Sequence, residues 1–195
     1  MRLDFRHTRF LTSAADLRGL PPDQGREVAF SGRSNAGKSS ALNAITGVSG
    51  LARVSKTPGR TRLLNLFTVD GDLRLVDLPG YGYAKAPQAE RARWGQLLEE
   101  YFTQRRCLMG LMLIMDVRHP LTDFDEQLMA FAAPLSLRVH VLLSKSDKLG
   151  YGAGQKSLAA VKRGLQGRAS AQLFSAHSNA GVEEAQQVLA GWFGE

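Results

Sequence analysis

The sequence predicts an α/β fold in three layers: a mostly parallel six-stranded sheet with one antiparallel edge strand, and helices on both of its faces. Three observations predict this fold. Apolar runs of strand length alternate with amphipathic stretches along the 195 residues. Gly, Pro, Asp or Ser residues separate these segments. One pair of strand-like runs has no helix between its members, so this pair is predicted to be antiparallel and the other strands parallel.

The first half of the chain contains the predicted hairpin. A buried strand over residues 27–32 breaks into a Gly-rich turn, and a helix follows from 38 to 45. The runs 62–69 and 73–78 are separated by Asp-Gly-Asp, which is a tight-turn signal, so they are predicted to form a hairpin. The spacing of apolar residues in 88–104 predicts a helix with one buried face.

The second half continues the alternation of strand and helix. The run 108–117 is too apolar for an exposed strand, and we expect it at the centre of the sheet. The remaining predicted strands are 137–145 and 171–176, and the remaining predicted helices are 123–133, 154–167 and 181–193.

The composition indicates one folded domain. At 195 residues and 44% hydrophobic content, the chain can bury one core but not two. We expect this domain at 25–195, with residues 1–24 forming an edge strand or a flexible arm. The single Cys107 precludes an internal disulfide and fits a cytoplasmic protein. No segment approaches the ~20 apolar residues that span a bilayer, and the N-terminus lacks the apolar region of a secretory signal.

Residues 32–39, GRSNAGKS, fit the phosphate-binding pattern G-x-x-x-x-G-K-[ST]. The glycines let the backbone curl so that several N–H groups point at phosphate oxygens. Lys38 is expected to reach the β- and γ-phosphates, and Ser39 to ligate Mg²⁺. The predicted nucleotide contacts of this loop are Gly32, Arg33, Ser34, Asn35, Ala36, Gly37, Lys38, Ser39 and Ser40.

Two later stretches favour guanine over adenine. SKSD, residues 144–147, ends a predicted strand and is similar to the [NT]-K-x-D motif of GTPases, from which Ser144 departs. The Asp147 carboxylate can accept hydrogen bonds from guanine N1 and N2, a donor pair that adenine lacks. SAH, residues 175–177, ends the next strand and is similar to the loop whose N–H contacts guanine O6. The predicted base contacts are Ser144, Lys145, Ser146, Asp147, Ser175, Ala176 and His177.

A third stretch, DLPG at residues 77–80, follows another predicted strand. Asp77 is expected to bind Mg²⁺ through water, and the N–H of Gly80 to contact the γ-phosphate. Leu78 and Pro79 complete this predicted contact. An acidic residue at such a strand end is how many nucleotide hydrolases hold their metal.

The segment 51–62 is polar and basic and lacks the periodicity of a strand or helix. A Thr from such a segment ligates Mg²⁺ in the triphosphate state and is released after hydrolysis. Thr57 and Thr61 are the candidates, and Thr61 is favoured because it directly precedes the next strand. Gly59 and Arg60 are predicted nucleotide contacts beside it, and the predicted metal ligands are therefore Ser39, Thr61 and Asp77.

The stretches GREVAFSGRSNAGKSSALNAI, SKTPGRTRLLNLF and DLPGYGYAK together resemble the EngB family, in the TrmE–Era–EngA–EngB group of bacterial P-loop GTPases. The resemblance runs from about Phe10 to the C-terminus. It implies a single P-loop GTPase domain that binds GTP or GDP with Mg²⁺. It further implies a protein that assists late assembly of the large ribosomal subunit and is linked to normal cell division and septation. We expect this protein to be a cytoplasmic monomer.

The source of the water-activating group stays open. Tyr81 stands where the best-known GTPases have a water-positioning Gln, and a phenol cannot orient water as a carboxamide does. In potassium-using GTPases of the broader group, an Asn at the position of Asn35 ligates K⁺, which could act as an arginine finger does. The alternative source is the ribosomal particle. The candidate catalytic residues are Lys38, Thr61, Gly80 and Asn35.

The net charge of +7 indicates a polyanionic partner. Four basic residues lie in the acid-free segment 51–62, and others lie on the predicted helix 154–167, so we expect contacts with ribosomal RNA of the large-subunit precursor. No membrane partner is expected. The sequence also bears on two other functions. SKSD argues against a nucleotide kinase, whereas Tyr81 leaves open a guanine-nucleotide-dependent binding scaffold with negligible turnover.

Overall fold

The computed structural model describes residues 3–52, 63–80 and 88–194. Its strands are β1 (Arg9–Ala14), β2 (Arg26–Gly32), β3 (Leu64–Asp70), β4 (Leu73–Asp77), β5 (Leu108–Asp116), β6 (Arg138–Ser144) and β7 (Ser170–Leu173). Its α-helices are α1 (Lys38–Thr46), α2 (Gln88–Gln104), α3 (Asp123–Ala132), α4 (Tyr151–Leu165) and α5 (Val182–Phe193). Short 3₁₀ helices lie at η1 (Phe5–His7), η2 (Leu17–Gly19), η3 (Ala133–Leu135) and η4 (Ser146–Lys148).

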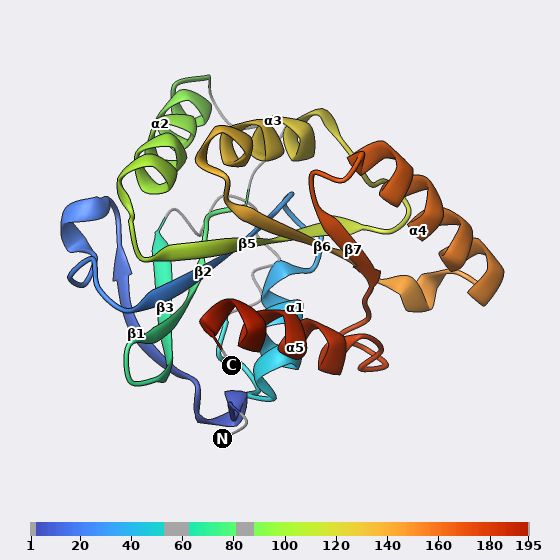
Figure 1. Ribbon diagram of the computed structural model, residues 1–195, viewed down its shortest axis with the longest axis horizontal. Helices are drawn as coiled ribbons and strands as arrows, with labels where there is room; N and C mark the ends of the chain where they lie inside the picture. Colours follow the sequence, from blue (N-terminus) through green and yellow to red (C-terminus); the bar gives the residue numbers. More distant parts are fainter. Residues whose placement is uncertain (1–2, 53–62, 81–87, 195) are drawn as a thin grey trace.

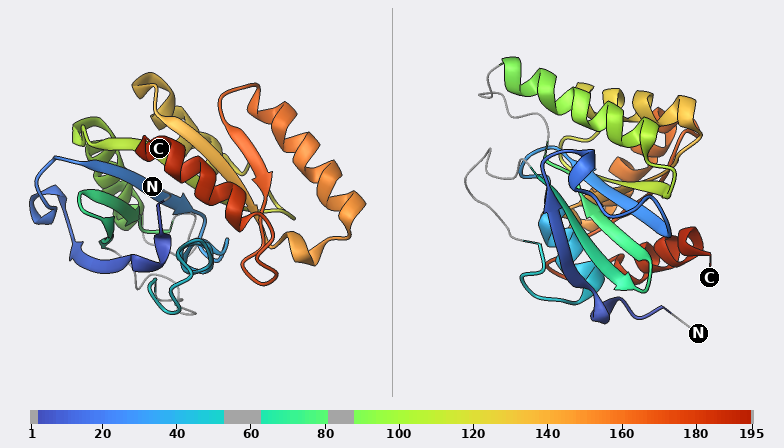
Figure 2. Two further views of the ribbon diagram at one scale, coloured as in Figure 1. Left: turned by 60° about the horizontal axis from the view of Figure 1, so that its bottom comes forward. Right: turned by 90° about the vertical axis from the view of Figure 1, so that its left-hand side faces the viewer.

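The strands form one sheet in the order β1-β3-β4-β2-β5-β6-β7. β3 runs antiparallel to both of its neighbours, and the other pairs are parallel. Helices α2, α3 and α4 cover one face and α1 and α5 cover the other (Figures 1 and 2). The predicted three-layer α/β fold is confirmed.

Within the described residues the sheet has seven strands, where the sequence predicts six. The additional strand is β1, which pairs with β3 from Arg9 opposite Thr68 to Ala14 opposite Leu64. β3 is therefore the predicted antiparallel strand but is not the edge, because β1 covers it. Most β1 side chains are exposed, so their pattern shows no buried face, and only the backbone pairing distinguishes an edge strand from an arm.

The strand–helix alternation follows from burial on both faces of the sheet. In β5, Leu111 and Leu113 pack under α2, α3 and α4, whereas Met112 and Ile114 pack under α1 and α5. This explains why 108–117 is a continuous apolar run and not an alternating one. Helix α4 begins three residues earlier than predicted, because Gly150 takes an extended conformation at the N-cap and the glycines after it are accommodated within the helix.

A buried ionic network lies at the end of the sheet opposite the loop that follows β2. The fully buried Glu27 carboxylate accepts hydrogen bonds from Arg74 Nε at 2.8 Å, from Arg105 Nη2 at 2.7 Å and from the Tyr101 hydroxyl at 3.2 Å. Burial is the main cause that raises the pKa of Tyr101 well above its usual value. The network joins β2 and β4 to the end of α2.

We expect Glu27→Gln to lower the free energy of unfolding by about 3–5 kcal/mol, because two buried guanidinium groups lose their counter-ion. Urea unfolding measures the loss. The control is Glu126→Gln, which breaks a half-exposed pair with Arg168 (2.8 Å) and should cost less than about 1 kcal/mol. Equal losses in the two variants would contradict a stabilising role of the buried network.

Among the described residues, no helix has the length and apolar character needed to cross a membrane.

Candidate functional site

The carboxyl ends of the parallel strands place the predicted site residues along one edge of the sheet. β2 ends at Gly32 and the loop after it leads into α1 at Lys38. β4 ends at Asp77, and β6 ends at Ser144. Because β4, β2, β5 and β6 are parallel neighbours, the predicted phosphate, metal and base residues of the described segments lie side by side.

The backbone of the phosphate loop requires its particular residues. A Cβ on Gly32 would lie 2.6 Å from the Ile114 carbonyl oxygen, so only glycine fits there. Gly37 has φ +100° and Asn35 has φ 64°, a left-handed conformation that Asn tolerates better than most residues. The Ala36 N–H donates to the Arg33 carbonyl at 2.9 Å and closes the turn. A Cβ on Gly80 would lie 3.6 Å from the Gly32 carbonyl oxygen, which places Gly80 against this loop.

Lys38 and Asp77 form an ion pair at the centre of this edge. Both side chains are nearly buried, with 10% and 5% of their surface exposed. The structure therefore brings together the residue predicted to bind phosphate and a residue predicted to bind Mg²⁺. A carboxylate that already faces one cation, with the hydroxyl of Ser39 on the same helical turn as Lys38, offers the hard oxygen ligands that Mg²⁺ prefers.

The donor chemistry fits a magnesium ion shared with a nucleotide. Within residues 3–52, 63–80 and 88–194, no group of three or more His, Cys, Asp or Glu side chains could hold a metal alone. Mg²⁺ at phosphate sites takes one or two protein ligands and completes its shell with water and phosphate oxygens. The other predicted residues of this part of the site, Thr57, Gly59, Arg60, Thr61 and Tyr81, lie outside the described residues.

Hydrogen bonds join the predicted base-binding stretch, residues 144–147, to the phosphate loop. Lys145, at φ 58°, donates from Nζ to the Asn35 carbonyl at 2.6 Å. The Ser144 hydroxyl donates to the carbonyl of Ala36 and, at 3.1 Å, to that of Met115. Ser144, which departs from the usual Asn or Thr, thus joins the two loops through its hydroxyl.

Asp147 is held in an ionised, oriented state. The Ser175 hydroxyl donates to Asp147 Oδ1 at 2.6 Å, and this hydrogen bond is the main cause that lowers the pKa of Asp147. The backbone N–H groups of His177 and Ser178 donate to the Ser175 hydroxyl at 3.2 Å. The two stretches predicted to contact guanine, 144–147 and 175–177, are therefore joined directly.

Asp116 joins the predicted site residues in the structure, although no sequence motif predicted it. Its carboxylate accepts hydrogen bonds from Lys145 Nζ at 2.9 Å and from Arg118 Nη2 at 2.7 Å. The Arg118 guanidinium is the main cause that holds the pKa of Asp116 well below its usual range. The signal in the sequence is an acidic residue at the end of an apolar strand, the same signal that identified Asp77.

We expect Asp116→Asn to weaken GTP and GDP binding alike by roughly tenfold, because Lys145 loses a charge-assisted hydrogen bond that holds it against the phosphate loop. Titration calorimetry with each nucleotide measures the change. Asp123→Asn, an exposed change in the first turn of α3, is the control and should leave both affinities unchanged. A variant that melts earlier yet binds both nucleotides normally would show that Asp116 has only a structural role.

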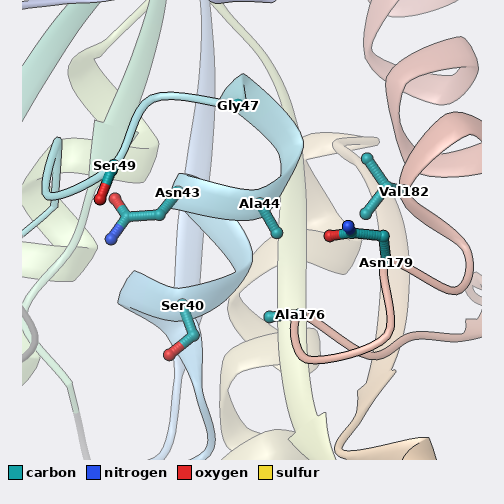
Figure 3. A pocket seen from close by; sticks show the side chains of 8 residues that line it. All are labelled: Ser40, Asn43, Ala44, Gly47, Ser49, Ala176, Asn179 and Val182. Carbon is teal, nitrogen blue, oxygen red and sulfur yellow. The ribbon is translucent and has the colours of Figure 1, made fainter.

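Two cavities border these loops. One of about 630 Å³ lies between α1 and the loop before α5, where Ala44 and Asn179 lie on opposite sides (Figure 3). It is lined by Ser40, Asn43, Ala44, Gly47, Ser49, Ala176, Asn179 and Val182. Its lining includes Ser40 and Ala176, both predicted nucleotide contacts. The second cavity, of about 290 Å³, lies beside Asn35, Asp116 and Lys145 on the other side of the phosphate loop.

Known proteins share both the sequence and the fold. A family model described as "50S ribosome-binding GTPase" matches residues 27–145. "Probable GTP-binding protein EngB" of Coxiella burnetii is 50% identical to the chain over 192 residues, which are 97% of this chain and 94% of that protein. The chain belongs to the EngB family of GTP-binding proteins. The resemblance carried by the sequence motifs is thereby confirmed, and the family is one of GTPases that bind guanine nucleotide.

Solved structures confirm the P-loop GTPase fold of this EngB-family chain. The crystal structure of a probable GTP-binding protein EngB has a TM-score of 0.71 at 19% identity, covering 86% of this chain and 98% of that one. Aquifex aeolicus Era, crystallised with GDP and AlF₄⁻, has a TM-score of 0.69 at 20% identity, covering 87% of this chain and 57% of that one. At these identities the likeness concerns the fold alone.

Proposed function

We propose that this EngB-family chain is a Mg²⁺-dependent switch that hydrolyses GTP to GDP and phosphate and assists late assembly of the large ribosomal subunit in the cytoplasm. The proposal that the chain binds a nucleotide is supported by one observation. Lys145 and Ser144 donate hydrogen bonds that hold the predicted base site against the predicted phosphate site. The ribosomal part is supported by the description of the matching family model and by the net charge of +7. The link to cell division and septation is part of the same proposal.

The proposed domain organisation is one G domain at 25–195, to which residues 1–24 add the edge strand β1, in a monomeric protein. We propose nucleotide contacts at three groups of described residues. These are 32–40 in the phosphate loop, 77–80 after β4, and 144–147 with 175–177 around the base. Gly59, Arg60 and Thr61 are proposed to complete the contacts from outside the described residues. The proposed Mg²⁺ ligands are Ser39, Thr61 and Asp77.

Each proposed residue has a distinct chemical task. Lys38 leaves Asp77 to neutralise the β- and γ-phosphates, while the N-terminal end of α1 and the loop N–H groups bind the same oxygens. When bound, Mg²⁺ supplies further neutralisation of the charge on the transferring phosphate. The Gly80 N–H contacts the γ-phosphate. Asp147 accepts from guanine N1 and N2, and Ser175 keeps its carboxylate pointed at the base.

The missing catalytic element is proposed to be K⁺ bound near Asn35. Two features fix the position of Asn35 in the phosphate loop. Its backbone is left-handed, and its main-chain carbonyl accepts a hydrogen bond from Lys145 Nζ. A cation beside the phosphates would act as an arginine finger does, which is worth ~10³–10⁵ in rate. We expect faster GTP turnover in K⁺ than in Na⁺ at equal ionic strength, and a smaller difference in Asn35→Ala. Equal rates of GTP turnover in K⁺ and in Na⁺ would contradict the proposed role of K⁺.

The function is tested by GTP turnover of the purified protein with and without large ribosomal subunits. We expect slow turnover alone and stimulation by large subunits, with no stimulation by small subunits as the control. The alternative function is a guanine-nucleotide-dependent binding scaffold, which Tyr81 favours because it replaces the water-positioning residue. Binding to the large subunit without measurable turnover in any salt would establish that alternative instead.

A further inference from the structure

Helix α4 carries the strongest local excess of positive charge in the second half of the chain. From Lys148 to Val182 the sequence contains no Asp or Glu, whereas it contains Lys148, Lys156, Lys162, Arg163 and Arg168. Helices α2, α3 and α5 each carry at least two acidic residues, whereas α1 and α4 carry none, and α4 has three basic residues where α1 has one. The excess is therefore a property of one element and not of the surface in general.

The basic side chains of α4 point away from the core. The helix packs on β7 through buried Gly154, Val161 and Leu165. Lys156, Lys162 and Arg163 are exposed, and none of them forms an ion pair with a residue that the structure describes. Arg168, just beyond the helix, differs because it pairs with Glu126. Figure 1 shows α4 at the β7 end of the sheet, where none of the described helices and strands covers its outer side.

A second feature distinguishes this surface from an ordinary solvated helix. Tyr151, the first residue of α4, has 84% of its surface exposed, the largest value among the exposed large hydrophobic side chains of the described residues. Between Lys156 and Lys162 the exposed positions are small, since they are Ala159 and Ala160. Basic side chains and an exposed aromatic ring on one helix are the combination that binds RNA phosphates and stacks on an unpaired base. A membrane surface would instead need an apolar band, and the exposed side of α4 has none.

We propose that the outer face of α4 is an RNA-binding surface, on which Lys156, Lys162 and Arg163 contact phosphates and Tyr151 stacks on an unpaired base. The identity of the RNA as that of the large ribosomal subunit rests on the proposed function. Since α4 is a regular helix fixed to the sheet and lies outside the segments predicted to switch, its contacts are the same in the GTP and GDP states. This surface supplies the nucleotide-independent share of the affinity.

The experiment measures binding of the intact protein to a fluorescent RNA hairpin with an unpaired loop, and to purified large subunits, with a GTP analogue and with GDP. The variant Lys156→Gln with Arg163→Gln removes two charges and keeps good helix formers. The matched control, Arg9→Gln with Arg18→Gln, removes two exposed charges on β1 and η2, at the opposite end of the sheet. Tyr151→Ala tests stacking, and vesicles of acidic phospholipid test the membrane alternative.

We expect the α4 variant to bind the hairpin roughly tenfold or more weakly near 100 mM salt, with a slope of log affinity against log salt shallower by about 1.4–1.8. The loss should be equal with both nucleotides, and the control should differ little from the unaltered protein. An α4 variant that binds the hairpin as the control does, or an unaltered protein that binds only the vesicles, would overturn the proposal.

The two proposals fail separately. If the unaltered protein does not bind large subunits, the proposed function fails, and the hairpin still decides whether α4 binds RNA. If large subunits are bound equally by the unaltered protein and the α4 variant, the function stands, and α4 is not the surface that meets the ribosome.

Discussion

Asp147→Asn should lower the affinity for GTP by roughly 10⁴-fold and create affinity for xanthosine triphosphate. The Asp147 carboxylate is an acceptor, and Ser175 and the N–H groups behind it fix its orientation. An amide in its place presents an NH₂ group to the guanine N2 donor, so two donors face each other. Xanthine carries a carbonyl oxygen there, which the amide can satisfy. Titration calorimetry with GTP and with xanthosine triphosphate measures both changes.

The matched variants separate the carboxylate from its support. Ser175→Ala should weaken GTP binding by roughly tenfold, because Asp147 stays charged but loses the hydrogen bond that orients it. Asp70→Asn, at the exposed end of β3, should have no effect on either nucleotide. Normal GTP affinity in Asp147→Asn would show that guanine is not recognised at this loop. Because the pKa of Asp147 is lowered from an already acidic value, its carboxylate stays ionised between neutral pH and pH 5.

Lys38→Ala should lower GTP turnover by at least about 10²–10³-fold, because the group that stabilises charge on the β- and γ-phosphates is lost. The substitution also leaves the buried Asp77 carboxylate without its cation, so the protein without nucleotide should melt earlier. Single-turnover hydrolysis and a thermal melt measure the two effects on the same preparation. Mg²⁺ with GDP should restore less stability to the variant than to the unaltered protein.

Lys38→Met serves as a second variant, since its apolar stem keeps the packing if Lys38→Ala proves too unstable. Arg9→Ala removes an exposed charge on β1 and should leave turnover unchanged. If Lys38→Met hydrolyses GTP at the normal rate, Lys38 is not the phosphate-binding residue, and the ion pair with Asp77 is only structural.

The order and type of the main elements could be predicted because each depends on a local pattern. Helix α2 has the predicted bounds, 88–104. The continuous apolar run of β5 correctly predicted a strand inside the sheet that is buried on both faces. The loop 32–39 was predictable because its pattern is local in the sequence, and Gly37 within it has φ +100°, a backbone conformation that favours glycine. Motifs of this kind are contained in a few consecutive residues, so they can be recognised without knowledge of the rest of the chain.

Features that depend on distant partners could not be predicted. β1 has few buried side chains, so only its pairing with β3 defines it. The role of Asp116 depends on Lys145, which lies 29 residues further along the chain and meets Asp116 only in the folded structure. The exposure of Tyr151 likewise becomes visible only when α4 is packed on β7. The sequence thus predicts local motifs better than contacts between residues that lie far apart in the chain.

The central claim is that the bound nucleotide controls binding to the large ribosomal subunit. Co-sedimentation of the protein with purified large subunits, with a non-hydrolysable GTP analogue, with GDP and without nucleotide, tests it most directly. We predict that the largest bound fraction occurs with the GTP analogue and that Asp147→Asn abolishes this advantage unless the xanthosine analogue is supplied. Bound fractions that are the same in all three conditions would contradict the claim that this chain is a switch.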